Sequence, residues 1–255
     1  MAENIRNIRS RDRTYPSSLQ LEGQVLDSGH ITVQGAVDFL AEPHIGIKAD
    51  LVLDEIRLDD IFPVTGRVNV PLRQGILSGR GQVEYSPLVK SARLNDLRIE
   101  EMHLDYVHAA QTAVAEEKVA AATAHAAKKM SNHPEWLIRV DQAKILNSEL
   151  GFVNHATTPP YRIFLTDASI AMENFSNQLT EGTAFVKVTG KFMGSGLAQA
   201  NGTFRPEKAS PDFTVQMRLL KTRLRSLNDV LRAYGDFDVA DGVLSFFSEL
   251  TVKDG

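Results

Sequence analysis

Apolar and polar residues alternate along most of this chain with a period of two, which is typical of β-strands. In 213–219 the odd-numbered positions are apolar and the even-numbered positions are Thr, Gln and Arg. Residues 45–53 show the same alternation. Each stretch therefore predicts a strand with one apolar face and one polar face. The residues expected on the apolar face are Ile45, Ile47, Leu51, Leu53, Phe213, Val215, Met217 and Leu219.

These two stretches belong to a longer internal repeat. Residues 21–35 align with residues 188–202 without a gap, and Gly23, Gly29 and Gly35 fall opposite the glycines at 190, 196 and 202. Further along, residues 75–78 align with residues 242–245. Each copy has the order strand, short Leu-rich bend, glycine and strand. A unit this thin cannot bury its own apolar face, so we expect the copies to lie side by side in an array.

The bend in the second copy predicts a short helix. Leu and Val recur every three or four positions over 224–231, which is the spacing of one helix face. Ser226 is placed to start this helix and Gly235 to end it. We expect a similar short helix at the bend of the first copy.

Residues 107–130 predict a long helix. The segment is rich in Ala and other strong helix formers and contains neither Gly nor Pro. Asp105 can cap its start, and Lys128 and Lys129 suit the negative end of the helix dipole. Its apolar stripe is mostly Ala, so it can bury only a thin face. Such a helix could cover the mouth of a groove or serve as a solvent-exposed spacer.

Together these patterns predict a mainly β protein. Repeated antiparallel β-meander units would form a curved, groove-like sheet, with the long Ala-rich helix inserted between two copies and short helices at the bends. The strand pattern continues to Gly255 without a terminal cap, so we expect the chain to be part of a longer protein. The expected divisions are a linker or disordered lead (1–18), a first β unit (19–106), the helix (107–130) and a second β unit (131–255) that contains the second repeat copy (183–255).

Composition excludes several classes of function. The net charge of -4 gives no long-range attraction to nucleic acid, and no basic run is interleaved with aromatic residues. The chain has no cysteine, which excludes disulfides, thiolate nucleophiles and zinc-thiolate sites. No apolar run approaches the roughly 20 residues that span a bilayer, so the chain as written is expected to be soluble.

The sequence offers little catalytic chemistry. The best cluster is His103, Asp105 and His108, but it straddles a predicted strand-to-helix boundary and lacks the i, i+4 spacing of a zinc-protease pair. These residues are better interpreted as solvated side chains. GxSxG, P-loop and HExxH motifs are absent from the sequence. We therefore expect no enzyme activity, no catalytic residues, no metal and no cofactor.

Four segments of the second half carry a family resemblance: LGFVNHATTPPYRIFL (150–165), NFSN (174–177), the GSG…NGTFRP hairpin (194–206) and LNDVLRAYGDFDVADG (227–242). In these segments the chain resembles the AsmA-like envelope proteins of Gram-negative bacteria, most closely the branch called domain of unknown function 748. The resemblance is clear over roughly the last half of the chain. The first half is assigned through the internal repeat.

The resemblance implies a large protein that is anchored in the inner membrane by an N-terminal helix and carries repeated β units in the periplasm. It also implies a long, curled sheet whose apolar concave side passes phospholipid toward the outer membrane. This chain lacks the anchor, which would belong to the parent protein. The resemblance implies phospholipid as a partner, together with possible envelope proteins.

Alternation alone leaves two arrangements open. The apolar rows could close on each other as a sandwich core, or they could form a groove that holds acyl chains. The first arrangement would make the chain a structural or protein-docking module of the envelope with a closed β core. The second would make it a lipid-binding segment, and the array pattern and the family resemblance favour it.

Overall fold

The structure is a computed structural model of the 255-residue chain. It describes residues 2–3, 14–25, 28–61, 72–110, 136–177, 182–204 and 212–253. Within these ranges the chain is mainly β, as the alternation predicted.

The bounds of the elements follow the chain in order. The strands of the first half are β1 (Ala2–Glu3), β2 (Ser17–Val25), β3 (Gly29–Asp38), β4 (Gly46–Arg57), β5 (Leu72–Arg73), β6 (Ile76–Tyr85), β7 (Lys90–Glu100) and β8 (His103–His108). Those of the second half are β9 (Leu137–Asn154), β10 (Tyr161–Ser176), β11 (Ala184–Phe192), β12 (Gly196–Phe204), β13 (Phe213–Arg223) and β14 (Val243–Val252). The helical segments are α1 (Leu58–Ile61), the 3-10 turn η2 (Leu224–Leu227) and α3 (Asn228–Gly235).

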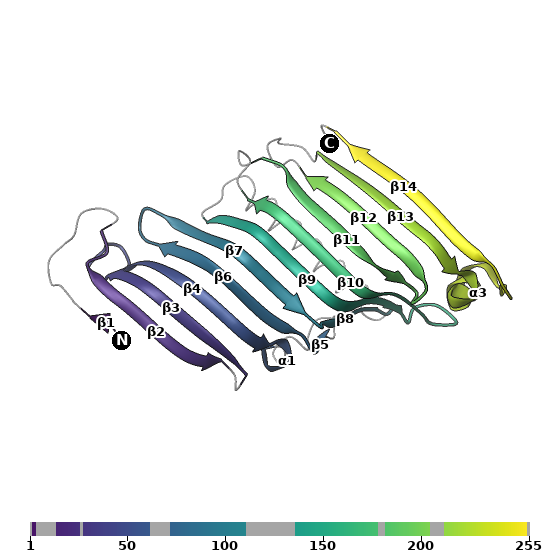
Figure 1. The fold of residues 1–255 in the computed structure, drawn as a ribbon, viewed down its shortest axis with the longest axis horizontal. Coiled ribbons are helices and arrows are strands. Elements are labelled where there is room, and N and C mark those ends of the chain that lie inside the picture. Colours follow the sequence, from purple (N-terminus) through teal and green to yellow (C-terminus); the bar gives the residue numbers. More distant parts are fainter. Residues whose placement is uncertain are drawn as a thin grey trace.

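The strands form one 14-stranded sheet (Figure 1). The main order is β1-β2-β3-β4-β6-β7-β9-β10-β11-β12-β13-β14, and β8 pairs with β5 and β9 beside it. Neighbouring strands are antiparallel except that β7 and β8 both run parallel to β9. The sheet does not close on itself. In the described part of the chain no second sheet packs on it, so the sandwich arrangement is not found there.

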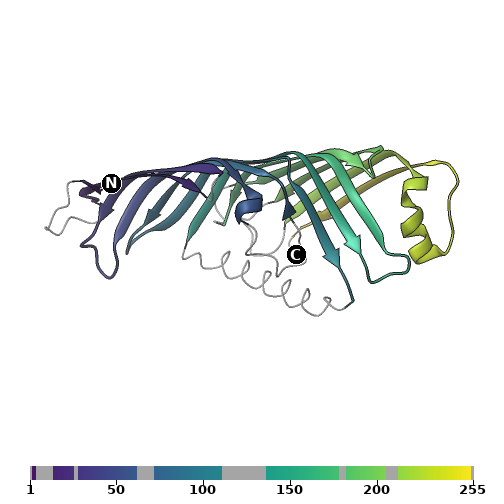
Figure 2. The ribbon, with the colours of Figure 1, turned by 90° about the horizontal axis from the view of Figure 1, so that it is seen from below.

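The sheet is arched (Figure 2). Several strands contain a non-glycine residue with positive φ close to a shift in register, namely Glu55 of β4, Asn147 of β9, Asp167 of β10 and Lys221 of β13. The strand pairing places these bulges at a similar level across the sheet. A β-bulge bends its strand and increases the local twist. The helical segments α1 and α3 lie beyond the bulges, on the lower side of the arch in Figure 2.

Two glycines permit close packing at the bulges. A Cβ on Gly29 would collide with both the backbone and the side chain of Ile56, the residue that follows the Glu55 bulge. A Cβ on Gly196 would collide with Thr222, which follows the Lys221 bulge. The sequence alignment matches these two glycines, and they have the same role in their respective strands.

Other contacts also recur between the two aligned segments. The amide of Leu58 donates to the carbonyl oxygen of Gly75 at 2.9 Å, and the amide of Leu224 donates to that of Gly242 at 3.0 Å. The bulge amides behave alike: Glu55 donates to Ser78 Oγ at 3.1 Å, and Lys221 donates to Ser245 Oγ at 3.2 Å. Both segments therefore turn from strand to bend through the same hydrogen bonds.

Several predicted boundaries differ from the structure. Ala2–Glu3 and Ser17–Ser18, which were assigned to the lead, lie in β1 and β2 because they pair with each other and with β3. Val107 and His108, which were assigned to the helix 107–130, lie in β8, because their pairing with β9 overrides their local helix propensity. Residues 111–130 lie outside the described residues.

The bend of the second half is helical, as predicted, but its ends differ. Ser226 does not cap the helix; its hydroxyl donates instead to the carbonyl oxygen of Arg223 at 2.6 Å. Gly235 is the last helical residue, and Asp236 takes the left-handed C-cap conformation with φ of 55°. Among the described residues no helix is both long enough and apolar enough to cross a membrane.

Candidate functional site

One face of the sheet carries an uninterrupted row of apolar residues and glycines. Because directly paired residues of neighbouring strands share a face, the register can be followed from β2 to β14. The resulting apolar row is Gly23, Ile31, Leu53, Gly79, Leu97, Ala143, Met172, Val186, Gly202, Val215 and Leu250. The row contains no polar or charged side chain over its whole length.

A second row runs beside the apolar row, nearer the bulges. It consists of Ile56, Leu77, Ile99, Ile145, Ile170, Val188, Ala200, Met217 and Ser248. Only its last member is polar. Together with their apolar neighbours on the same face, the two rows form what we call the apolar face.

The apolar face lies on the inner side of the arch. Tyr161, which shares this face with Leu165 and Ile163 through the regular pairing of β10 with β9, contacts Tyr234 of α3. Figure 2 places α3 on the lower side, toward which the sheet bends. Large side chains of this face are partly accessible: Met217 is 37% exposed and Leu250 is 55% exposed.

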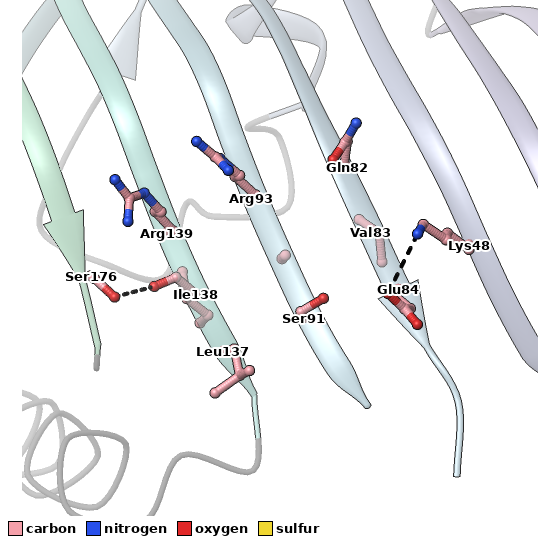
Figure 3. A pocket seen from close by; sticks show the side chains of 11 residues that line it. Lys48, Gln82, Val83, Glu84, Ser91, Arg93, Leu137, Ile138, Arg139 and Ser176 are labelled. Carbon is pink, nitrogen blue, oxygen red and sulfur yellow. Dashed lines mark hydrogen bonds and ion pairs between the residues drawn. The ribbon is translucent and has the colours of Figure 1, made fainter. Parts of the chain in front are cut away.

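The opposite face, which we call the polar face, carries many charged and polar side chains together with exposed apolar residues such as Val52, Phe185 and Leu197. A pocket of about 270 Å³ lies on it, lined in part by Lys48, Arg93 and Arg139 (Figure 3). Arg93 and Arg139 are directly paired across β7 and β9, an arrangement of like charges that is unfavourable unless it is offset. Asp141 offsets it, because its carboxylate accepts from Arg93 Nε at 2.8 Å and from Arg139 Nε at 2.6 Å.

The remaining charges of this pocket also have partners. Lys48 lies 3.9 Å from Glu84, and Figure 3 shows the two side chains side by side on neighbouring strands. The hydrogen bond from Arg93 lowers the pKa of Asp141 below its ordinary value, while burial opposes this shift. The charges of this pocket are therefore paired, and this part of the polar face favours contact with water.

A shallow cavity of about 330 Å³ lies on the apolar face in the second half of the sheet. β9 to β13 contribute its lining, which is almost entirely hydrocarbon. Its main side chains are Leu150, Phe152, Ile163, Leu165, Val188, Phe192, Met217 and Leu219. A cavity of this size and lining suits a small apolar ligand or one chain of a larger one.

Most of the predicted site residues lie on this face. Ile47, Leu51 and Leu53 of β4 share it with Phe213, Val215, Met217 and Leu219 of β13. The pairing brings the β13 residues beside β12, whereas the β4 residues lie far across the sheet. Ile45 precedes β4, outside the strand pairing, and is exposed.

Sequence reasoning missed the residues of the cavity that come from β9 to β12. Leu150 and Phe152 lie in the predicted second β unit (131–255), in which an apolar face was predicted only for 213–219. The alternation of β9 changes parity at Asn147, where φ is 50°. Ile145 and Phe152 therefore share a face although their numbers differ by an odd amount. A signal for this change would be a break in alternation within a long apolar strand.

The residues of the histidine cluster are spread along a single strand. His103, Asp105 and His108 all lie on β8, and the carboxylate of Asp105 accepts from Arg162 Nε at 2.9 Å. A search of the described residues for groups of His, Cys, Asp and Glu that could hold a metal ion found none.

Comparisons of the chain with models of known protein families and with curated proteins found no match.

Proposed function

We propose that the apolar face binds the acyl chains of phospholipid or a related lipid. The observation that carries this proposal is the apolar row, which crosses the sheet from Gly23 to Leu250 without a polar side chain. A sheet face of this kind needs an apolar partner to remove it from water. Hydrocarbon chains are suitable partners because they require no hydrogen-bonding groups, and the apolar row offers none from its side chains.

The free energy gained by burying methylene groups supports an acyl chain as the ligand. Burial of each CH2 contributes roughly 0.8 kcal/mol, so a chain of ten methylenes would gain about 8 kcal/mol before the costs of binding. That gain requires no specific polar contact, and it grows with each further methylene that is buried. The arch of the sheet, with its apolar side inward, would shield such a chain from water and act as a groove.

The resemblance to AsmA-like proteins extends this proposal to a biological setting. The chain would be a periplasmic segment of a protein that is anchored in the inner membrane and conducts phospholipid between the inner and outer membranes. The hydrogen bonds shared by the Leu58 and Leu224 bends support the view that the groove is built from repeated units. An array of such units would extend the groove from strand to strand.

The test uses the purified chain and diphenylhexatriene, an apolar probe that fluoresces when it leaves water. We expect saturable binding by the wild-type chain. Met217→Gln and Val215→Thr place polar groups on the apolar face and should weaken binding several-fold. Arg218→Gln, which changes the polar face of the same strand, is the matched control. A correctly folded wild-type chain that leaves the probe dark would contradict the proposal.

Native mass spectrometry of the chain purified from a bacterial membrane-rich lysate would identify the bound lipid. We expect mass additions that correspond to phospholipid or fatty acid. The same measurement reports the assembly state.

A second candidate function is favoured by the edge strand β14. β14 pairs only with β13 among the described strands, and it carries exposed apolar residues on both faces, including Phe246 and Phe247. An unpaired edge of this type can accept a strand from another protein. The chain would then serve as a protein-docking module of the envelope, through the edge of an open sheet rather than through the surface of a closed core.

A further inference from the structure

Aromatic residues that also carry polar atoms border the apolar cavity at the end nearest to α3. The rings of Tyr106 and His108 on β8 stack on Phe152 of β9, with centroid distances of 5.9 and 6.5 Å. Phe152 in turn lies 6.3 Å from the ring of Tyr161. Tyr and His side chains have an apolar body and a polar end, so they suit the boundary between an apolar surface and water.

A chain of hydrogen bonds leads outward from this border. Asn154 Nδ2 donates to the hydroxyl of Tyr161 at 3.2 Å, and that hydroxyl lies 3.0 Å from the hydroxyl of Tyr234. The amide nitrogen of Asn154 can only donate, so Tyr161 accepts there and can direct its own hydrogen to Tyr234. The hydrogen of Tyr234 is then available for a further acceptor.

The position of α3 places Tyr234 beside Tyr161, at the aromatic border of the cavity. α3 follows β13 through η2 and packs against β10. Because β11 and β12 lie between β10 and β13, α3 must pass across the lower ends of these strands. These are the strands that form the cavity together with β9. Tyr234 is 69% exposed, so a ligand can reach it.

We propose that the Tyr234 hydroxyl hydrogen-bonds an anionic oxygen of the lipid headgroup while the acyl chain occupies the cavity of β9 to β13. This inference rests on the proposed function and adds the orientation of the ligand: its headgroup lies at α3 and its chain extends along the apolar face. Carboxylate and phosphate oxygens share the required chemistry.

The protonation state of Tyr234 suits this role. The neighbouring Tyr161 hydroxyl raises the pKa of Tyr234 above its ordinary value. Tyr234 therefore remains a neutral phenol at physiological pH. A neutral donor can approach an anion without charge repulsion, and hydrogen bonds to charged groups are stronger than those between neutral groups.

The test compares ligands with and without a headgroup on the full chain. cis-Parinaric acid has a carboxylate, a pyrene-labelled lysophospholipid has a phosphate, and diphenylhexatriene has neither. We expect Tyr234→Phe to weaken binding of a headgroup-bearing probe about fivefold and to leave diphenylhexatriene binding unchanged. A larger loss for the lysophospholipid identifies phosphate as the natural acceptor, and a larger loss for cis-parinaric acid identifies carboxylate.

Two further variants sharpen the test. Tyr161→Phe removes the group that orients Tyr234 and should give a smaller loss for the headgroup-bearing probes. Tyr85→Phe removes a hydroxyl near the opposite end of the strands, where Tyr85 stacks between His44 and Trp136, and should change none of the affinities. Circular dichroism checks that each variant is folded.

The outcomes separate this inference from the proposed function. If the wild-type chain binds the probes and Tyr234→Phe binds the two headgroup-bearing probes equally well, the orientation is wrong and the apolar face remains a lipid site. A wild-type chain that binds diphenylhexatriene but neither lipid probe overturns both the orientation and the assignment of a lipid as the ligand, and leaves only an apolar binding face. If the folded wild-type chain binds none of the probes, both proposals fail.

Discussion

Ile56 lies directly over Gly29, so close that a methyl group on the glycine would overlap the backbone and side chain of Ile56. Ile56 is only 3% exposed, and it belongs to the second row of the apolar face. Thr222 lies over Gly196 in the same way. The bend at the bulges therefore depends on the missing side chains of two glycines that are far apart in the sequence.

Gly29→Ala and Gly196→Ala should destabilise the protein. Each new methyl group would have to push a backbone aside, and overpacking of this kind costs about 1–3 kcal/mol. Gly202→Ala is the control, because a Cβ there meets its neighbours only at ordinary contact distances of 3.7 Å or more. Urea unfolding measures the free energies. Equal stability of all three variants would show that the close packing is not required.

Thr222→Val should stabilise the protein. The Thr222 side chain is fully buried, and its Oγ1 atom has no hydrogen-bond partner among the described residues. An unsatisfied buried hydroxyl costs about 1–3 kcal/mol, and Val has nearly the same shape without this group. We expect a gain of roughly 1 kcal/mol in the free energy of unfolding, seen as a higher Tm. An unchanged or lower Tm would mean that the hydroxyl is satisfied in solution.

Asp141→Asn should weaken the centre of the sheet in a pH-dependent way. The hydrogen bond from Arg93 lowers the pKa of Asp141 in the folded protein, so this carboxylate stabilises the fold above its unfolded pKa of about 4. That contribution is lost as the pH falls through the folded pKa. We expect the variant to be less stable by roughly 1–2 kcal/mol at pH 7.

The difference between Asp141→Asn and the wild type should shrink as the pH falls below about 4. Urea unfolding at a series of pH values measures it. Asp96→Asn on neighbouring β7 is the control, since the structure describes no side-chain hydrogen bond for Asp96. A gap that stays constant between pH 7 and pH 3 would contradict the assigned role of Asp141.

Phe247→Lys should reduce self-association of the chain. Phe247 lies on the polar face of edge strand β14 and is 64% exposed, and a lysine on an edge strand opposes edge-to-edge pairing. Analytical ultracentrifugation over a range of concentrations measures the effect, with Arg218→Gln on β13 as control. Diphenylhexatriene binding should be retained. If Phe247→Lys associates as strongly as the wild-type chain, the edge of β14 does not mediate the association.

The alternation of residues was sufficient to predict strands and their apolar sides locally. Leu53 and Val215 were placed on apolar faces from a period of two, and the register puts both in the apolar row. At a β-bulge, however, alternation no longer predicts which face a residue lies on. Glu55, Asn147 and Lys221 adopt positive φ without being glycine, and each shifts the parity of its strand, so local alternation does not carry across them.

The partners of each strand depend on long-range pairing that a local pattern does not contain. β7 and β9 run parallel at the centre of the sheet, although the sequence predicted antiparallel meanders throughout. The contact of Tyr161 with Tyr234 likewise joins residues 73 positions apart. Both features are contacts between residues that lie far apart in the sequence, and no short sequence motif predicts such contacts.

The apolar row would affect how a bound hydrocarbon chain moves across the sheet. Neighbouring strands are about 4.8 Å apart, and a hydrocarbon chain that shifts sideways by this step would meet another position of the same chemical kind, from Leu53 through Met172 to Leu250. Its free energy would change little from step to step, so the barriers between positions would be low. For a lipid bound as proposed above, such a surface would favour one-dimensional diffusion across the strands over long residence at any one of them.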